Sequence, residues 1–218
     1  MRGGNSMSRI VPIERKCAIC GAINEYSSLA STNTFGGGPD LDLRPAEMMR
    51  STMPVWIQEC PECGYISDPS EVTKEWLKSE KYLLCDGIVF ASDLAKQFYK
   101  YYLINLEDDN PADAFFAILH AAWTCDDIDD SINAKHCREL AIPLAAKLIE
   151  EKYKDQENIK IMRADLMRRA GQFAELLKEY SSVQFEKELM NQILEFEIKK
   201  AKEKDIACYR VEDVTGKE

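Results

Sequence analysis

The sequence is poor in histidine and has no long apolar run, and each shortage argues against a class of protein. Two histidines among 218 residues leave little for acid–base catalysis, because histidine is the side chain that titrates near neutral pH. No apolar stretch reaches the roughly eighteen residues that suggest a membrane-spanning helix. Residues 1–8 also lack the apolar core of a signal peptide. We therefore expect a cytoplasmic protein that makes no use of a membrane.

Clustered positive charge is equally scarce. The chain carries a net charge of −10 at neutral pH, and the balance is negative both up to Ser70 and after it. A protein that neutralises nucleic-acid phosphates needs Lys and Arg gathered on one surface. The composition therefore disfavours nucleic acid as a partner.

Cysteine, by contrast, is plentiful, with eight residues. In a reducing compartment such cysteines are metal ligands or buried thiols more often than disulfides. Residues 17–21 and 60–64 both read C-x-x-C-G, a spacing at which two thiolates converge on one ion. Four thiolates bind Zn²⁺ tetrahedrally and leave no position for substrate. We predict a single structural zinc ion, bound by Cys17, Cys20, Cys60 and Cys63.

The alternative is two unrelated cysteine pairs, one of them redox-active. A thioredoxin-like motif requires a strand before it and a helix after it. Neither Gly21 nor Gly64 opens a predicted helix, so the zinc site is favoured. The segment between the two motifs is then an insertion in a split zinc ribbon.

Composition divides the chain into a head, residues 1–67, and a body, residues 68–218. The head is rich in Gly, Pro, Ser and Thr, with short β-type runs at residues 9–11 and 55–57. Residues 27–40 are polar and contain three consecutive glycines, which predicts a loop.

Helix start signals recur through the body, each before apolar residues with helical spacing. Asp68-Pro69, Ser92 and Asn110-Pro111 are candidate N-caps, and a fourth lies at Asp130 or Ser131. Three later helices are expected, the first ending at Gly171 and the others near residues 173–180 and 185–204. Because short connections favour antiparallel neighbours, a stack of helical hairpins is predicted.

Charged and apolar residues alternate from Asp40 to Arg44. The period of two predicts a strand with Leu41 and Leu43 on a buried face and Asp40, Asp42 and Arg44 on the other. These charges either form a recognition site or pin the inserted segment to the ribbon or the body by ion pairs, which are common and usually weak. The second interpretation is favoured. We expect the segment to pack near the zinc site and Asp42→Ala to have little effect.

Two further groups of residues could be considered as metal sites, but other roles explain them better. A second site could draw on His120, Cys125, His136 and Cys137, but buried Cys is a common small hydrophobe. The acidic run at residues 126–130 lacks the Gly and the terminal Glu of an EF-hand calcium loop. Capping of the following helix is the favoured role of this run.

The stretches Asp40–Met48 and Trp56–Tyr65 resemble an uncharacterised prokaryotic family whose members join a split zinc ribbon to tetratricopeptide-like helices. Residues 164–173 are similar to part of one tetratricopeptide hairpin, with Leu176 where a small Ala is usual. The positions that match are Ala164 at the helix contact, Gly171 and Phe173 at the turn, and Tyr180 in the second helix. The resemblance implies a mainly α fold: a small β zinc-ribbon head followed by an antiparallel, tetratricopeptide-like helical-hairpin body. It implies no activity.

The functional prediction is a non-enzymatic adaptor or scaffold. A stack of helical hairpins offers a concave surface for a protein or peptide partner. The alternative is nucleic-acid binding through the ribbon, with Arg9, Arg15, Lys16, Arg44 and Arg50 as the cationic candidates. A third possibility is an enzyme with a site around Asp40 and Asp42, where head and body meet.

Overall fold

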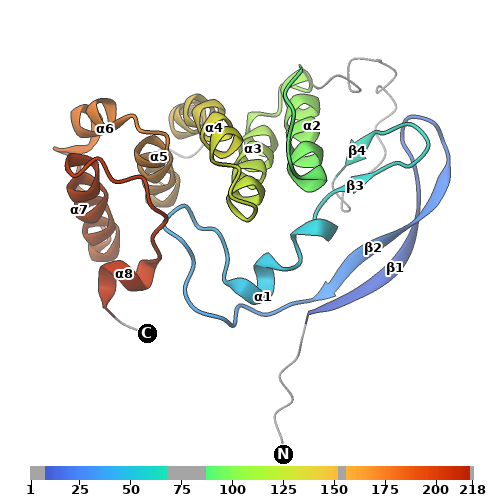
Figure 1. The fold of residues 1–218 in the computed structure, drawn as a ribbon, viewed down its shortest axis with the longest axis horizontal. Coiled ribbons are helices and arrows are strands. Elements are labelled where there is room, and N and C mark those ends of the chain that lie inside the picture. Colours follow the sequence, from blue (N-terminus) through green and yellow to red (C-terminus); the bar gives the residue numbers. More distant parts are fainter. Residues whose placement is uncertain (1–7, 68–86, 152–155, 217–218) are drawn as a thin grey trace, which may run out of the picture.

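The computed structural model describes residues 8–67, 87–151 and 156–216. Two β-hairpins lie at one end of the molecule, and a row of helices extends away from them (Figure 1). The helix predicted to start at Asp68 lies outside the described residues. Within the described ranges, no helix has both the length and the hydropathy needed to cross a membrane.

The first hairpin pairs strand β1, Arg9–Lys16, with strand β2, Ile23–Ser31, in antiparallel register. The predicted β run at residues 9–11 is therefore confirmed as the start of a longer strand. The loop predicted from residue 27 is wrong up to Ser31, because residues 27–31 complete β2 by pairing with β1. This strand can contain many polar residues because both of its faces are largely exposed to solvent.

The second hairpin is minimal, with β3 at Gln58–Glu59 and β4 at Ile66–Ser67. A strand was expected at residues 55–57, but a 3₁₀ helix, η1, spans Met53–Val55. Pro54 explains the difference, since it has no N–H to donate to a ladder and its φ suits a helical turn. One short helix, α1, at Glu47–Arg50, precedes it.

The helices that follow Ser92, Asn110 and Asp130 begin where the sequence predicts, whereas the short helix at Val211–Thr215 was not predicted. Ser92 Oγ accepts from the Ala95 N–H at 3.3 Å, and Asn110 Oδ1 accepts from the Asp113 N–H at 3.3 Å. Gly171 adopts a φ of +81° after the fifth helix, as expected of a helix end. The bounds are α2 Asp93–Glu107, α3 Pro111–Asp126, α4 Ser131–Glu151, α5 Glu157–Arg169, α6 Phe173–Tyr180, α7 Glu188–Lys202 and α8 Val211–Thr215.

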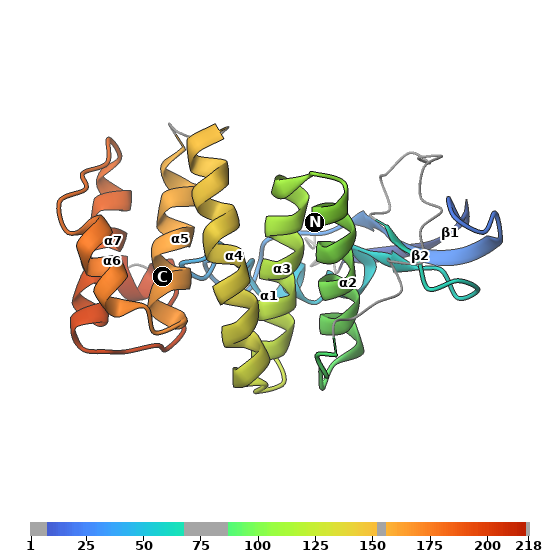
Figure 2. The same cartoon turned by 90° about the horizontal axis from the view of Figure 1, so that it is seen from above.

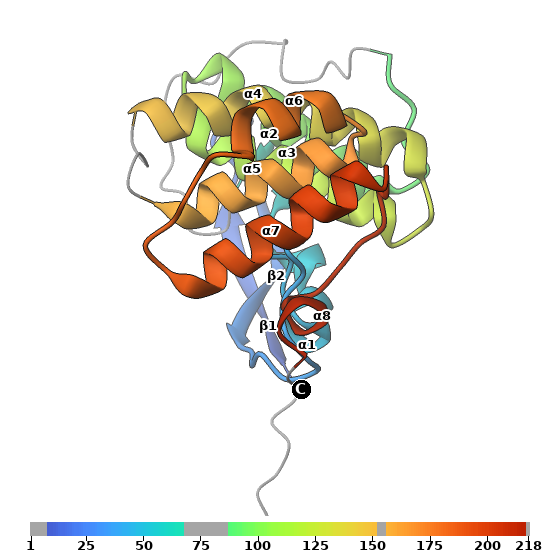
Figure 3. The same ribbon diagram turned by 90° about the vertical axis from the view of Figure 1, so that its left-hand side faces the viewer.

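Helices α2 to α7 stand side by side (Figure 2): α2 packs on α3, α3 on α4 and α4 on α5, whereas α5, α6 and α7 all contact one another. The inserted segment, which we define as residues 32–57, runs along one side of this row. Helices α3, α5 and α7 lie nearer to it than α2, α4 and α6 (Figure 1). Seen along the row, the segment and α8 lie together beneath the helices (Figure 3).

One contiguous hydrophobic core joins the helices to the head. Its largest apolar side chains include Phe98, Phe115 and Leu119, which are fully buried. The same cluster contains Cys17 and Cys60 of the hairpins. Among the described residues, this core includes side chains from both before and after residue 67. It therefore marks no boundary there, and the division into two domains at residue 67 stays a prediction.

A buried charge cluster joins α5 to α7. Arg168 is fully buried and donates from Nε to Glu197 Oε2 at 2.5 Å and from Nη2 to Asp165 Oδ1 at 2.8 Å. Its Nη1 donates to the carbonyl oxygens of Asp205 and Ala207. Burial raises the pKa of Glu197 from 4.5 to about 8, with a further increase from the Asp165 carboxylate and opposition from Arg168. Burial also raises the pKa of Asp165, so the Asp165–Glu197 pair holds a proton near neutral pH, with Glu197 as the favoured site.

This proton makes stability depend on pH. Between pH 4.5 and about 8, folding takes up a proton at Glu197, so its contribution falls as pH rises and levels off above about pH 8. One proton gives a slope of up to about 1.4 kcal/mol per pH unit. We expect urea unfolding from about pH 6 to pH 9 to show this decline for the wild type and a flatter curve for Glu197→Gln. The matched variant is Glu195→Gln, whose carboxylate is exposed on the same helix. Equal slopes for the wild type and Glu197→Gln would contradict the assignment.

Candidate metal centre and its junction with the helices

Each C-x-x-C-G motif forms the tip of one hairpin, and the two tips share one backbone pattern. In the first, the Cys17 N–H donates to the Ala22 carbonyl at 2.8 Å and the Gly21 N–H donates to the Cys17 carbonyl at 3.1 Å. The corresponding bonds of the second motif, from Cys60 and Gly64, measure 2.7 and 2.8 Å. Gly21 and Gly64 have φ angles of +74° and +73°, which only glycine adopts without strain. The glycine that ends each motif is thus required by the turn itself.

The two tips bring all four sulfur atoms together. Cys17 Sγ lies 3.6 Å from Cys63 Sγ, and Cys20 Sγ lies 3.6 Å from Cys60 Sγ. All four lie within 4.8 Å of one another. A disulfide would need about 2.05 Å, so these are not bonded pairs. Around an ion with Zn–S bonds of about 2.3 Å, a tetrahedron has edges of about 3.8 Å. The cluster therefore has the dimensions of a four-thiolate site.

Local groups shift the acidity of individual thiols. Burial raises the pKa of Cys60, but the backbone N–H groups of Cys63 and Glu62 and the neighbouring thiols lower it to about 7. Burial raises the pKa of Cys63 to about 12. One thiolate thus forms readily, while a second thiolate in the same cluster needs a cation to compensate its charge.

The donor set fits zinc better than a harder ion. Thiolates select Zn²⁺ and other soft metals, whereas Ca²⁺ and Mg²⁺ require oxygen ligands. In addition, the Ile19 N–H points at Cys17 Sγ from 3.4 Å, as outer hydrogen bonds to ligating sulfur do. Among the residues that the structure describes, these four cysteines are the one group of Cys, His and carboxylate side chains close enough to hold a metal.

The other candidate metal ligands have structural roles. His120 lies among aromatic rings, and Cys125 and Cys137 are fully buried in the helical body. In the acidic run, Asp130 Oδ1 accepts from the Asn133 N–H at 3.2 Å at the start of α4, which confirms the capping role. Asp126 forms ion pairs with Arg138 and Arg169.

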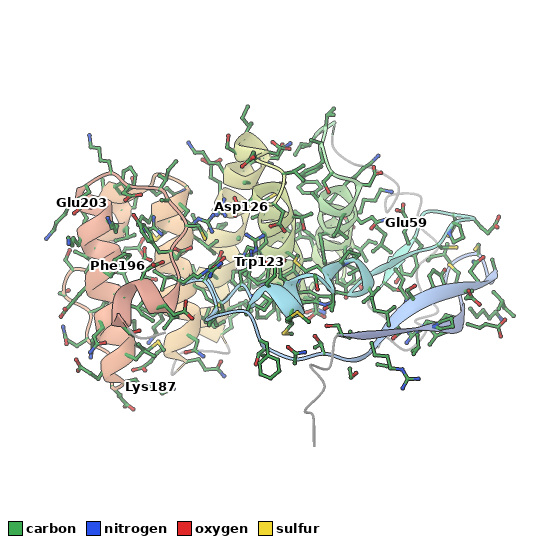
Figure 4. The ribbon with its side chains drawn as sticks, turned by 60° about the horizontal axis from the view of Figure 1, so that its bottom comes forward. Glu59, Trp123, Asp126, Lys187, Phe196 and Glu203 are labelled. Carbon is green, nitrogen blue, oxygen red and sulfur yellow. The ribbon has the colours of Figure 1, made fainter. Side chains whose placement is uncertain are left out.

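Asp42 is the main link between the inserted segment and the helices. It is fully buried, and its Oδ2 accepts from Trp123 Nε1 of α3 at 2.7 Å and from Arg169 Nη1 of α5 at 3.3 Å. Its Oδ1 accepts from the Arg44 N–H at 3.2 Å. Figure 4 shows Trp123 and Asp126 where the segment crosses the helical row. The segment is therefore attached to two helices by one carboxylate.

Arg44 and Asp40 extend this attachment. Arg44 is buried and pairs with Asp127 at the end of α3. Asp40, also buried, lies 3.7 Å from Arg50 and 3.9 Å from Arg210 in its ion-pair contacts, and its backbone bridges Arg210. Burial raises the pKa of Asp40, with a further increase from Asp42. The predicted ion-pair role of these three residues is thus found, but in the interior.

Two predictions about residues 40–44 are wrong. The segment forms a tight turn, in which the Leu43 N–H donates to the Asp40 carbonyl at 2.9 Å and Leu43 has a φ of +65°. Leu41 is 1% exposed and Leu43 is 40% exposed, so the leucines do not share a face as a strand would require. The polar contacts described for residues 40–44 outside the turn go to α1, α3, α5 and the C-terminal residues, and in Figure 1 this stretch lies far from the hairpin tips, whereas packing near the zinc site was expected.

Sequence reasoning missed the arginines and acids that receive the inserted segment. Arg169 and Asp127 pair directly with Asp42 and Arg44 of the segment, and the helix residues Asp126, Arg138, Asp165 and Arg168 form further ion pairs behind them. One signal could have revealed them. Asp165, Arg168 and Arg169 stand at helical spacing within a stretch that also carries Met162 and Leu166. Charged residues that interrupt an apolar helix face in this way indicate buried ion pairs.

The fold and the site define a mainly helical protein with a four-cysteine cluster at the tips of two small antiparallel hairpins. No protein-family model, no curated protein and no solved structure matches this chain. The similarity to a family of split zinc ribbons with tetratricopeptide-like helices therefore rests on the residues quoted above.

Proposed function

We propose that the protein is a non-enzymatic adaptor, stabilised by one zinc ion at Cys17, Cys20, Cys60 and Cys63. The observation that supports the proposal is the elongated stack of helices α2 to α7, in which packing is between nearby helices and no described helix is surrounded on all sides. Such arrays leave long faces free for partners. Four thiolates around zinc leave no open coordination position, so the metal serves structure and performs no chemistry.

The inserted segment changes which face the partner can use. It covers the side of the row formed by α3 and α5, through the contacts of Asp42 and Arg44. A peptide would have to break those buried bonds to occupy that surface. The adaptor would therefore bind its partner on surfaces left open beside the segment or on the opposite side of the row.

Charge distribution supports a protein or peptide partner over nucleic acid. Of the five cationic candidates on the head, Arg44 and Arg50 are neutralised by Asp127, Asp40 and Glu47. Arg9, Arg15 and Lys16 remain on β1, where Glu14 directly precedes Arg15 and Lys16. Three cations next to a carboxylate form a weak phosphate-binding surface.

We expect duplex and single-stranded nucleic acids to bind weakly or not at all at physiological salt. Fluorescence anisotropy with labelled oligonucleotides checks this, and dissociation constants weaker than about 10⁻⁶ M are expected. A salt-sensitive affinity near 10⁻⁸ M that drops in Arg15→Glu would make the ribbon the working surface and end the adaptor proposal. If nucleic acids bind only weakly, affinity capture from the native host, followed by mass spectrometry, identifies the protein partner.

A further inference from the structure

A cavity of about 350 Å³ lies between the head and the helices, beside the C-terminal end of the inserted segment. It opens between β2, the residues after η1, and helices α2 and α3. Its volume is within the range of small-ligand sites, about 300–1,000 Å³. The residues that matter for its chemistry are Leu29, Trp56, Phe98, Asp113, Phe116 and His120.

Five aromatic side chains line the cavity, and several of their rings contact one another. The His120 ring lies 5.0 Å from Trp56 and 5.2 Å from Phe98, with interplanar angles of 68° and 70°. Trp56 Nε1 donates to Thr52 Oγ1 at 2.9 Å. The one polar atom of the indole is therefore satisfied by the protein, and its half-buried ring is left for apolar or cation–π contact.

The imidazole in this wall carries no charge. Burial lowers the pKa of His120 to about 3, so the ring is neutral at physiological pH. A cation that enters the cavity would thus meet no positive charge from this side chain.

Asp113 is the one charged side chain among the described residues that line the cavity. It is exposed in the first turn of α3, and its Oδ2 accepts from Asn110 Nδ2 at 2.6 Å. No Lys or Arg lines the cavity in the described part of the chain. Aromatic walls, one carboxylate and no opposing cation complement an ammonium ion that carries alkyl groups, which binds to ring faces.

We propose that this cavity binds an alkylated ammonium group, with its N-alkyl carbons against the rings of Trp56, Phe116 and His120 and its charge near Asp113. The inference goes beyond the adaptor proposal and does not depend on it. The group could belong to a free quaternary amine or to a methylated lysine of a partner, because both present the same chemistry.

The test compares choline with its uncharged tert-butyl isostere, dimethylbutanol, by isothermal titration calorimetry on the full zinc-loaded chain. We expect choline to bind about tenfold more tightly than the isostere, as the range of cation–π energies allows. Equal binding of the two would show a plain apolar cavity and overturn the proposal. Absence of binding by choline at tens of millimolar, together with absence of binding by a trimethyllysine peptide, would also overturn it.

Variants locate the site. Asp113→Asn should weaken choline binding about fivefold and Trp56→Leu should abolish it, while zinc content and circular dichroism stay unchanged. The matched control is Asp93→Asn, since Asp93 is an exposed acid in the first turn of α2 and does not line the cavity. An equal loss in Asp93→Asn and Asp113→Asn would indicate a general charge effect and contradict the site. If a trimethyllysine peptide binds more tightly than choline, the ligand is a side chain of a partner protein. If choline binds at least as tightly as the peptide, the ligand is a free amine.

Discussion

Replacing Cys60 with serine is expected to remove the metal and to unfold both hairpins. Each hairpin is a two-stranded ribbon, and such ribbons are marginally stable alone. β3 and β4 have only two residues each. Structural zinc supplies about 10–16 kcal/mol in small zinc-finger peptides, and most of this binding energy is lost when one of four thiolates is removed.

Metal analysis of protein purified under reducing conditions, without chelator, checks the expectation. About one zinc per chain is expected for the wild type and none for Cys60→Ser. Hydrogen exchange should show residues 9–31 unprotected in the variant and α3 still protected. Cys208→Ser is the matched control, because Cys208 is exposed and lies outside the sulfur cluster. A wild type without metal, or a Cys60→Ser protein with full zinc, would refute the four-thiolate site.

Asp42→Ala is the second change for which we expect a large effect, contrary to the prediction from the sequence. The variant leaves the Trp123 Nε1–H without its acceptor and removes one carboxylate from Arg169 in the interior. Removing one partner of a buried ion pair typically costs about 3–5 kcal/mol. Arg169 keeps its 2.8 Å contact with Asp126, so a loss of about 3 kcal/mol is expected.

Urea unfolding of the variants at neutral pH measures this loss. Glu47→Ala is the matched control, since it removes an acid of the same inserted segment whose side chain is 69% exposed and lies 3.9 Å from Arg50. Its effect should stay below about 1 kcal/mol. Asp42→Asn keeps an oxygen that can accept from Trp123 but removes the negative charge. Comparing it with Asp42→Ala therefore separates the contribution of the hydrogen bond from that of the charge. If Asp42→Ala were as mild as Glu47→Ala, the segment would be held mainly by apolar contacts such as those of Leu41.

Local signals determined much of this protein from the sequence alone. The two C-x-x-C-G motifs predicted a shared site because their spacing and their glycines determine a turn within five residues. Ser92 and Asn110 marked helix starts because an N-cap acts on N–H groups only two or three residues away. The helical body followed from the same short-range periodicity.

Tertiary structure alone decided the surroundings of the inserted segment. Asp42 meets Trp123 and Arg169, which are 81 and 127 residues away, and no local pattern connects residues so distant. The alternation at residues 40–44 was misread as a strand because burial of Asp42 and the turn at Leu43 depend on the helices that receive them. The cavity beside Trp56 and His120 likewise exists only where two distant parts of the chain pack together. Caps, turns and hydrophobic periodicity depend on residues a few positions apart and can be read from the sequence. Buried ion pairs and cavities instead depend on how distant segments pack in the folded chain.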